Sequence, residues 1–218
     1  MKNEKKASKW VKRILVALII CVISIFTLLA GGAYWIFALT TNSEYLRSAA
    51  DSFMNISDPL PNGCSYYFGF CPFSRPYIRI RSKDMKTLYT FYEYMDMDNK
   101  LSSDIPVQKL VERAASGEVL GAFGSKSHQR MVISKQGTLL VGKQDMPYVI
   151  GHKDEPFSTD QVTVNCLMGF LKAPISGKLI VITVENLTGD NVLDKDKPLM
   201  PITIERVRSL TDGINSFK

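Results

Sequence analysis

The side chains best suited to nucleophilic or metal chemistry are few in this chain, namely four cysteines and two histidines. Two of the cysteines, Cys64 and Cys71, lie close together with six residues between them. This spacing matches neither a redox Cys-x-x-Cys motif nor a common zinc-binding pattern. On an oxidising side of a membrane, two cysteines so near each other favour a disulfide. We therefore predict a Cys64–Cys71 disulfide, and we expect no metal site and no cofactor.

A catalytic cysteine could be formed by Cys166 with His128 or His152 as its base. Cys166 lies in an apolar segment, however, and no local motif accompanies any of these residues. A buried structural cysteine is the commoner situation. The stretch 121–127 is loosely similar to a phosphate-binding loop, but Ser125 stands where that motif requires a glycine before the lysine. We predict no catalytic residues, and an enzyme is the less favoured class.

Aromatic residues crowd the segment between the two cysteines and just beyond it. Two interpretations stay open: the aromatic side chains cover one end of a sheet as core, or they form a surface for a partner or a membrane. The residues are Tyr66, Tyr67, Phe68, Phe70 and Phe73.

The elements that must position these groups begin with a membrane anchor. Residues 14–39 contain no Asp, Glu, Lys, Arg or His, and roughly 20 such residues suffice to cross a bilayer as a helix. Basic residues precede this segment, so the positive-inside rule predicts a cytoplasmic N-terminus and an extracytoplasmic C-terminal domain. The alternative is a signal peptide cleaved after Ala33. The basic topology signal consists of Lys2, Lys5, Lys6, Lys9, Lys12 and Arg13.

The formal net charge of +6 comes almost entirely from this N-terminal tail. Six of the 27 basic residues but one of the 21 acidic residues lie within residues 1–13. The part of the chain after Leu39 is therefore nearly neutral. A nucleic-acid-binding protein needs its basic excess on the folded domain, so we expect neither nucleic acid nor nucleotide as a partner. The expected partners are the lipid bilayer and other membrane or envelope proteins.

The pattern along the chain predicts four regions: a cytoplasmic tail at 1–13, a transmembrane helix at 14–39, a juxtamembrane helix and turn at 40–63, and an extracytoplasmic domain at 64–218. Short apolar runs separated by turns predict an α+β domain with a mainly antiparallel sheet and one or two packed helices. Helices are expected at 42–54, 105–116 and 209–217, with turns at 82–86, 135–137 and 173–177. Strands are expected at 77–81, 88–95, 119–123, 130–134, 138–141, 162–171, 178–185 and 202–207.

The residues that follow the anchor are similar to a loose group of uncharacterised bacterial single-pass membrane proteins. The likeness lies in Leu60-Pro61-Asn62-Gly63 and in the pair Phe68-Gly69. It covers about a tenth of the chain, and Cys64 and Cys71 are not part of that pattern. The resemblance implies an anchored α+β domain and no particular activity.

The absence of a coherent catalytic set favours a single-pass protein of the inner (plasma) membrane whose outer domain is an interaction or assembly module. Two other classes stay open. One is an anchored extracytoplasmic hydrolase, which would need a histidine, a nucleophile and a carboxylate brought together by the fold. The other is a carrier of lipid or a small ligand, which would need an enclosed apolar cavity.

Overall fold

The computed structural model describes residues 21–22, 24–27, 31–32, 38, 40–71, 75–95, 105–121, 126–154, 163–186 and 201–218. Contacts divide the chain into two compact units, Met1–Asn42 and Ser43–Lys218. Within the described ranges, no helix has both the length and the hydrophobicity needed to cross a bilayer. Most of the predicted anchor at 14–39, and all of its basic flank, lie outside these ranges.

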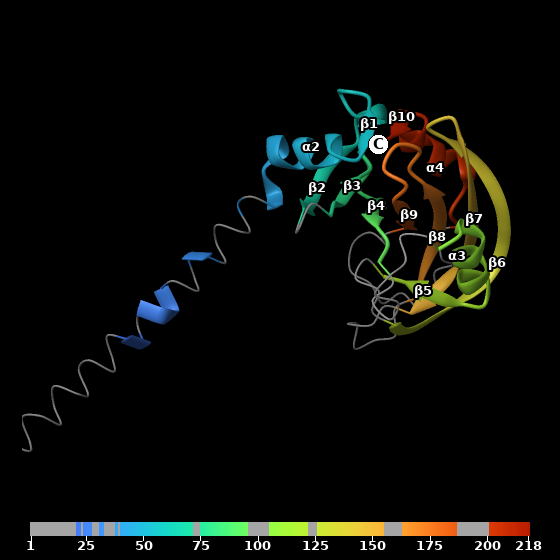
Figure 1. The fold of residues 1–218 in the computed structure, drawn as a ribbon, viewed down its shortest axis with the longest axis horizontal. Coiled ribbons are helices and arrows are strands. Elements are labelled where there is room, and N and C mark those ends of the chain that lie inside the picture. The colour runs from blue at the N-terminus through green and yellow to red at the C-terminus, as the bar shows by residue number, and fades with distance from the viewer. Residues whose placement is uncertain are drawn as a thin grey trace, which may run out of the picture. The chain divides into compact units, whose positions relative to one another are not determined.

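The unit Ser43–Lys218 is an α+β domain built on a curled antiparallel sheet (Figure 1). Its eight strands follow the order β2-β3-β4-β9-β8-β7-β6-β5. In that order they are Ser65–Phe70, Tyr77–Arg81, Thr87–Glu93, Leu179–Asn186, Thr163–Lys172, Gln144–Asp154, Lys126–Val141 and Glu118–Leu120. A separate antiparallel pair joins β1 (Met54–Ile56) to β10 (Ile214–Phe217). The helical segments are α2 (Ser43–Asp51), η1 (Pro61–Gly63), α3 (Val107–Ala115) and α4 (Ile204–Thr211).

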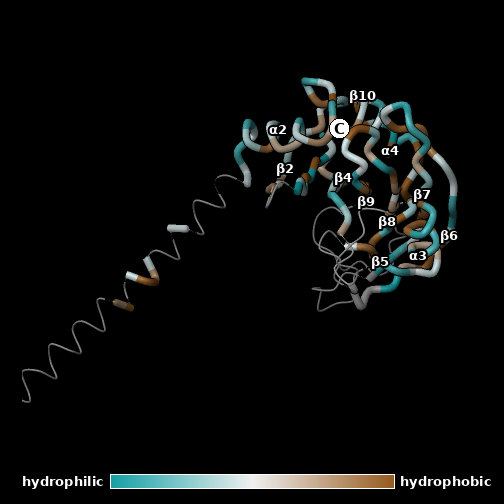
Figure 2. Tube along the Cα trace, in the orientation of Figure 1, coloured by the Kyte–Doolittle hydropathy of each residue, from teal (hydrophilic) through white to brown (hydrophobic). Residues whose placement is uncertain are grey.

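The central sheet has a hydrophobic core on each of its two faces. Successive side chains of a strand point to opposite faces, so the same strands contribute to both cores. The first core lies beneath α2 and α4, which contribute Ala49, Ala50, Val207 and Leu210. The second core lies beneath α3, which contributes Leu110 and Ala114. Strands buried on both sides read as continuous apolar runs, and Figure 2 shows apolar residues predominating along β8 and β9.

Several predicted elements are confirmed. The expected strands at 77–81 and 88–95 form the β3–β4 hairpin, in which Tyr77 pairs with Tyr92. The expected helix at 105–116 is α3, and it packs against β5, β7 and β8. The expected helix at 42–54 is the shorter α2, and the turn at 173–177 connects β8 to β9. The α+β class with a mainly antiparallel sheet is thus correct.

Two other predictions are wrong, each for a local reason. Residues 135–137 form no turn, because the long strand β6 runs through them and absorbs an irregularity between Ile133 and Lys135 as a bulge. The hairpin turn comes later, at Gly142 and Lys143, which both have positive φ. The expected strand at 202–207 is instead the start of α4, whose first turn is capped when the Arg206 amide donates to the Thr203 hydroxyl.

The C-terminus and one central strand also differ from expectation. The predicted helix at 209–217 is the end of α4 followed by β10. Strand β7 was not predicted, since its interior contains Pro147 and Gly151, residues that usually interrupt a sheet.

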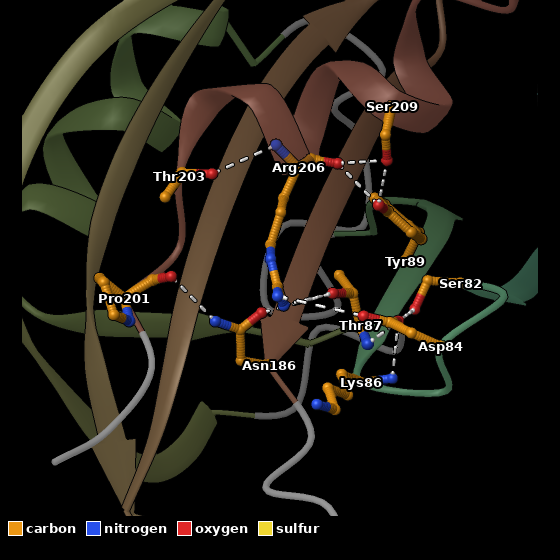
Figure 3. Close-up of polar contacts among 10 residues, drawn as sticks. All are labelled: Ser82, Asp84, Lys86, Thr87, Tyr89, Asn186, Pro201, Thr203, Arg206 and Ser209. Carbon is orange, nitrogen blue, oxygen red and sulfur yellow. Dashed lines mark hydrogen bonds and ion pairs between the residues drawn. The ribbon is translucent and has the colours of Figure 1, made fainter. Parts of the chain in front are cut away.

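A polar network attaches α4 to the sheet (Figure 3). The Tyr89 hydroxyl donates to the Arg206 carbonyl at 2.7 Å and lies 2.8 Å from the Ser209 hydroxyl. The Arg206 guanidinium donates to the Thr87 hydroxyl at 3.3 Å. The Asn186 side-chain amide donates to the Pro201 carbonyl at 3.1 Å, holding the segment that leads into α4. These contacts give α4 a defined position over the first core.

We expect Tyr89→Phe to destabilise the domain by about 1–2 kcal/mol, because it removes the hydrogen bonds that the Tyr89 hydroxyl makes with the Arg206 carbonyl and the Ser209 hydroxyl. In the purified full chain this corresponds to a fall in Tm of roughly 2–8 °C, measured by circular dichroism during heating. The matched control is Tyr67→Phe, which removes a hydroxyl from a side chain that is 45% exposed. Equal Tm values for the two variants would contradict the importance of this network.

Candidate interaction surface

The predicted disulfide between Cys64 and Cys71 is wrong in this structure, where both side chains are free thiols. The segment between them is the strand β2, not the predicted aromatic loop. An extended strand rises about 3.3 Å per residue, which places the two cysteines on the order of 20 Å apart. A disulfide requires Cα atoms within about 7 Å of each other, so a bridge could form only if β2 came apart.

Strand β2 divides the predicted aromatic cluster between the two sides of the sheet. Tyr66 pairs with Ile80 and packs against the first core, and burial raises its pKa to about 12. Phe68 and Phe70 pair with Arg79 and Tyr77 and point to the opposite side. Phe73 lies outside the described residues. Tyr66 therefore packs on the core, whereas Phe68 and Phe70 lie on the opposite side of β2.

Helix α2 packs on the side of β2 that is opposite to Phe68 and Phe70. A Cβ atom on Gly69 would lie only 2.9 Å from the Leu46 Cδ2 atom and 2.7 Å from the Ile78 Cδ1 atom. Glycine at this position thus allows α2 to pack closely on the strand. The side that carries Phe68 and Phe70 faces away from α2.

A row of aromatic rings runs across three strands on this second side. The ring centroids of Phe68 and Phe70 are 6.1 Å apart, and those of Phe70 and Tyr77 are 5.7 Å apart. The row continues to β4, where Tyr92 stacks on Tyr77 at 6.1 Å. These separations are within the range of favourable aromatic pairs. Burial raises the pKa of Tyr77, although the charge of neighbouring Arg79 opposes the shift.

Two arginines of β3 lie beside this row, because Arg79 and Arg81 alternate with the buried Ile78 and Ile80. The Arg81 Cζ atom lies 4.0 Å from the ring centroid of Tyr67, and the Arg79 Cζ atom lies 5.6 Å from that of Tyr77. Cation–π contacts of this kind orient a guanidinium. We call Tyr67, Phe68, Phe70, Tyr77, Arg79 and Arg81 the arginine–aromatic face.

The charges of these two arginines are not balanced within the described part of the chain. None of the described Asp or Glu carboxylates lies at ion-pair distance from either guanidinium. The Nε atoms of Arg79 and Arg81 are buried and have no hydrogen-bond partner among the described residues. Buried polar atoms usually have a partner, so these two donors mark an unusual place on the surface.

The carboxylate that lies across β4 from Arg81 is already engaged. Arg81 pairs with Leu88, and Leu88 pairs with Glu185 on β9. The Glu185 carboxylate lies 2.6 Å from the Lys153 ammonium group, with both side chains less than one-fifth exposed. The Lys153–Glu185 pair is internally neutral, so the arginine–aromatic face keeps a local positive charge.

Sheet register separates the candidate catalytic pair of Cys166 and His152. His152 pairs with Asn165, whereas Cys166 pairs with Gly151, so the two side chains lie on opposite faces of the sheet. Burial raises the pKa of Cys166 to about 12, which suppresses its nucleophilic thiolate. The side chain of His128 lies outside the described set. No group of three potential metal ligands occurs among the described His, Cys, Asp and Glu residues.

A hollow of about 500 Å³ lies between η1 and α4. The Asn62 side-chain amide crosses this region and donates to the Ser209 carbonyl at 2.6 Å. The hollow is open to solvent and has charged walls, so it differs from the enclosed apolar cavity that a lipid carrier needs. Its lining consists of Ser57, Pro61, Asn62, Glu205, Arg208, Ser209, Asp212 and Gly213.

No protein-family model matches the chain, and a search of curated proteins finds no significant relative. Function must therefore be inferred from the chemistry of the surface. The alternation of apolar and basic residues over 77–81 places Arg79 and Arg81 on one side of a half-buried strand. It did not indicate that β2 places Phe68, Phe70 and Tyr67 beside them.

We expect both Cys64 and Cys71 to be recovered as free thiols in non-reducing peptide mapping of the full chain. Burial raises the pKa of each thiol, so only a small part of each is present as the reactive thiolate at pH 7.5. Their alkylation should be slow at that pH and faster towards pH 9. Cys166, which is 1% exposed, serves as the internal control and should react only after unfolding. A disulfide-linked peptide containing both residues would contradict the extended β2.

Proposed function

We propose that this protein is a membrane-anchored, extracytoplasmic interaction module that binds another envelope or membrane protein through the arginine–aromatic face. The observation that carries the proposal is the pair Arg79 and Arg81, whose charges have no acidic partner among the described residues. Arginine and aromatic side chains are the residues most enriched at protein interfaces. Together they form the kind of surface that a partner would cover.

The anchor part of the proposal is supported by the uncharged stretch at 14–39 and the basic tail before it. The protein would then be a single-pass protein of the plasma (inner) membrane with residues 64–218 outside the cytoplasm.

No observation favours the hydrolase alternative. The described histidine, His152, is separated from Cys166 by the thickness of the sheet. The arginine–aromatic face contains no Ser, Cys, His, Asp or Glu to act as a nucleophile or general base.

The anchor can be tested by adding protease to right-side-out membrane vesicles that contain the full chain. We expect the domain at 64–218 to be digested, while a fragment containing residues 14–39 remains in the membrane after alkaline extraction. The control is an inside-out preparation, in which the same domain should be protected. A mature chain that begins at Tyr34 would show that the apolar segment is a cleaved signal peptide and would remove the anchor.

The interaction surface can be tested with a photo-crosslinking amino acid placed at Tyr67 in native membranes. We expect it to capture one protein partner reproducibly, because this side chain is exposed at the edge of the face. The matched control places the same amino acid at Ile175, which is 82% exposed but lies in the turn between β8 and β9. Identical products from both positions, or capture of this chain alone, would overturn the proposal.

A further inference from the structure

We infer that the arginine–aromatic face recognises an extended, acidic segment of the partner protein, which adds a strand to β2 and places alternate carboxylates on Arg81 and Arg79. This inference rests on the proposed function and deepens it, since it names the chemistry of the partner. Four features of the described residues support it.

The first feature is the open edge of the sheet. Among the described strands β2 pairs only with β3, and the sheet ends there. The other end of the sheet is the three-residue strand β5. An edge strand presents free N–H and C=O groups that can pair with an extended peptide. A bulge separates Tyr66 from Phe68, so the regular part Phe68–Phe70 is where a partner strand would pair.

The second feature is the direction in which Arg81 extends. Its Cα atom belongs to β3, yet its guanidinium stacks on Tyr67, a residue of the edge strand. The charge is thereby carried one strand outward, towards the place that an added strand would occupy. A guanidinium that stacks on a ring keeps N–H groups around its rim, and these bind a carboxylate in a bidentate manner.

The third feature is the spacing of the two arginines. Arg79 and Arg81 are alternate residues of one strand, which places their Cα atoms about 6.6–7 Å apart. An extended partner repeats its side chains on one side at the same interval. The best match is therefore an acidic-x-acidic pattern, in which the intervening residue points to the opposite side of the sheet.

The fourth feature distinguishes a peptide from a lipid surface. A protein that dips into a bilayer exposes large apolar side chains, but Phe68, Phe70 and Tyr77 are partly buried and pack on one another. Only Tyr67 of this face is among the exposed large hydrophobic residues. The half-buried rings form a firm platform beside the charges, which suits a peptide better than acyl chains.

The test is binding of a fluorescent peptide in which Glu alternates with Val to the purified full chain in detergent. We expect the double variant Arg79→Gln/Arg81→Gln to bind this peptide at least about tenfold more weakly than the original chain. The matched control is Arg130→Gln/Arg208→Gln, which removes the same charge from two exposed positions and should bind normally. Equal binding by both double variants would overturn the inference.

Two altered peptides separate charge from strand pairing. A peptide with Gln in place of Glu, and one with methylated backbone nitrogens at alternate residues, should each bind at least about tenfold more weakly. Full binding by the methylated peptide would exclude addition to the β2 edge. Binding to vesicles of phosphatidylglycerol that depends on both arginines, with no binding of the acidic peptide, would assign the face to lipid.

Charge reversal keeps the test informative if the glutamine variant folds poorly. Arg79→Glu/Arg81→Glu should lose the acidic peptide and gain binding to a peptide in which Lys alternates with Val, which only a folded face can do. If crosslinking at Tyr67 captures a partner but the acidic peptide does not bind, this inference fails while the proposed function stands. If the peptide binds but no partner is captured, the proposed function fails instead.

Discussion

The structure depends on the burial of its central strands on both faces. In β4 every residue from Thr87 to Tyr92 is buried, and β9 is nearly as inaccessible. A sheet that is buried on both faces needs a layer of packed structure, such as helices, on each face. Helices α2 and α4 provide one layer and α3 provides the other. Helix α3 packs over β5 to β8, and none of the described helices covers the second face of β2 and β3.

Arginines and aromatic rings occupy the side of β2 and β3 that no described helix covers. A guanidinium at a half-buried position loses hydration, and it needs a compensating contact. Lys153 obtains one from Glu185, and Arg113 obtains one from Glu118. Arg79 and Arg81 have the ring faces of Tyr77 and Tyr67 instead. Rings compensate a charge only partly, so these two arginines are the described cations best prepared to meet an external carboxylate.

The sequence predicted correctly those elements in which hydrophobic periodicity and neighbouring turn residues indicate the same structure. Strand β3 alternates apolar and basic residues, and α3 places Leu110 and Ala114 on one stripe, so both were predicted close to their observed bounds. The errors occurred where local signals conflict with long-range contacts. Gly137 resembles a turn residue, yet β7 pairs with it inside β6. Ile202 and Ile204 resemble a strand, yet Thr203 caps a helix there.

By itself the sequence determined the α+β class, the near neutrality of the chain after Leu39 and the fact that Arg79 and Arg81 share one side of β3, since these follow from composition and from a period of two. Only the tertiary structure decided that Cys64 and Cys71 lie beyond opposite ends of a strand. It also decided that Tyr67 stacks on Arg81 and that Cys166 and His152 face apart. Register between strands sets these relations, and register arises from the packing of distant residues against common cores, which no local pattern contains.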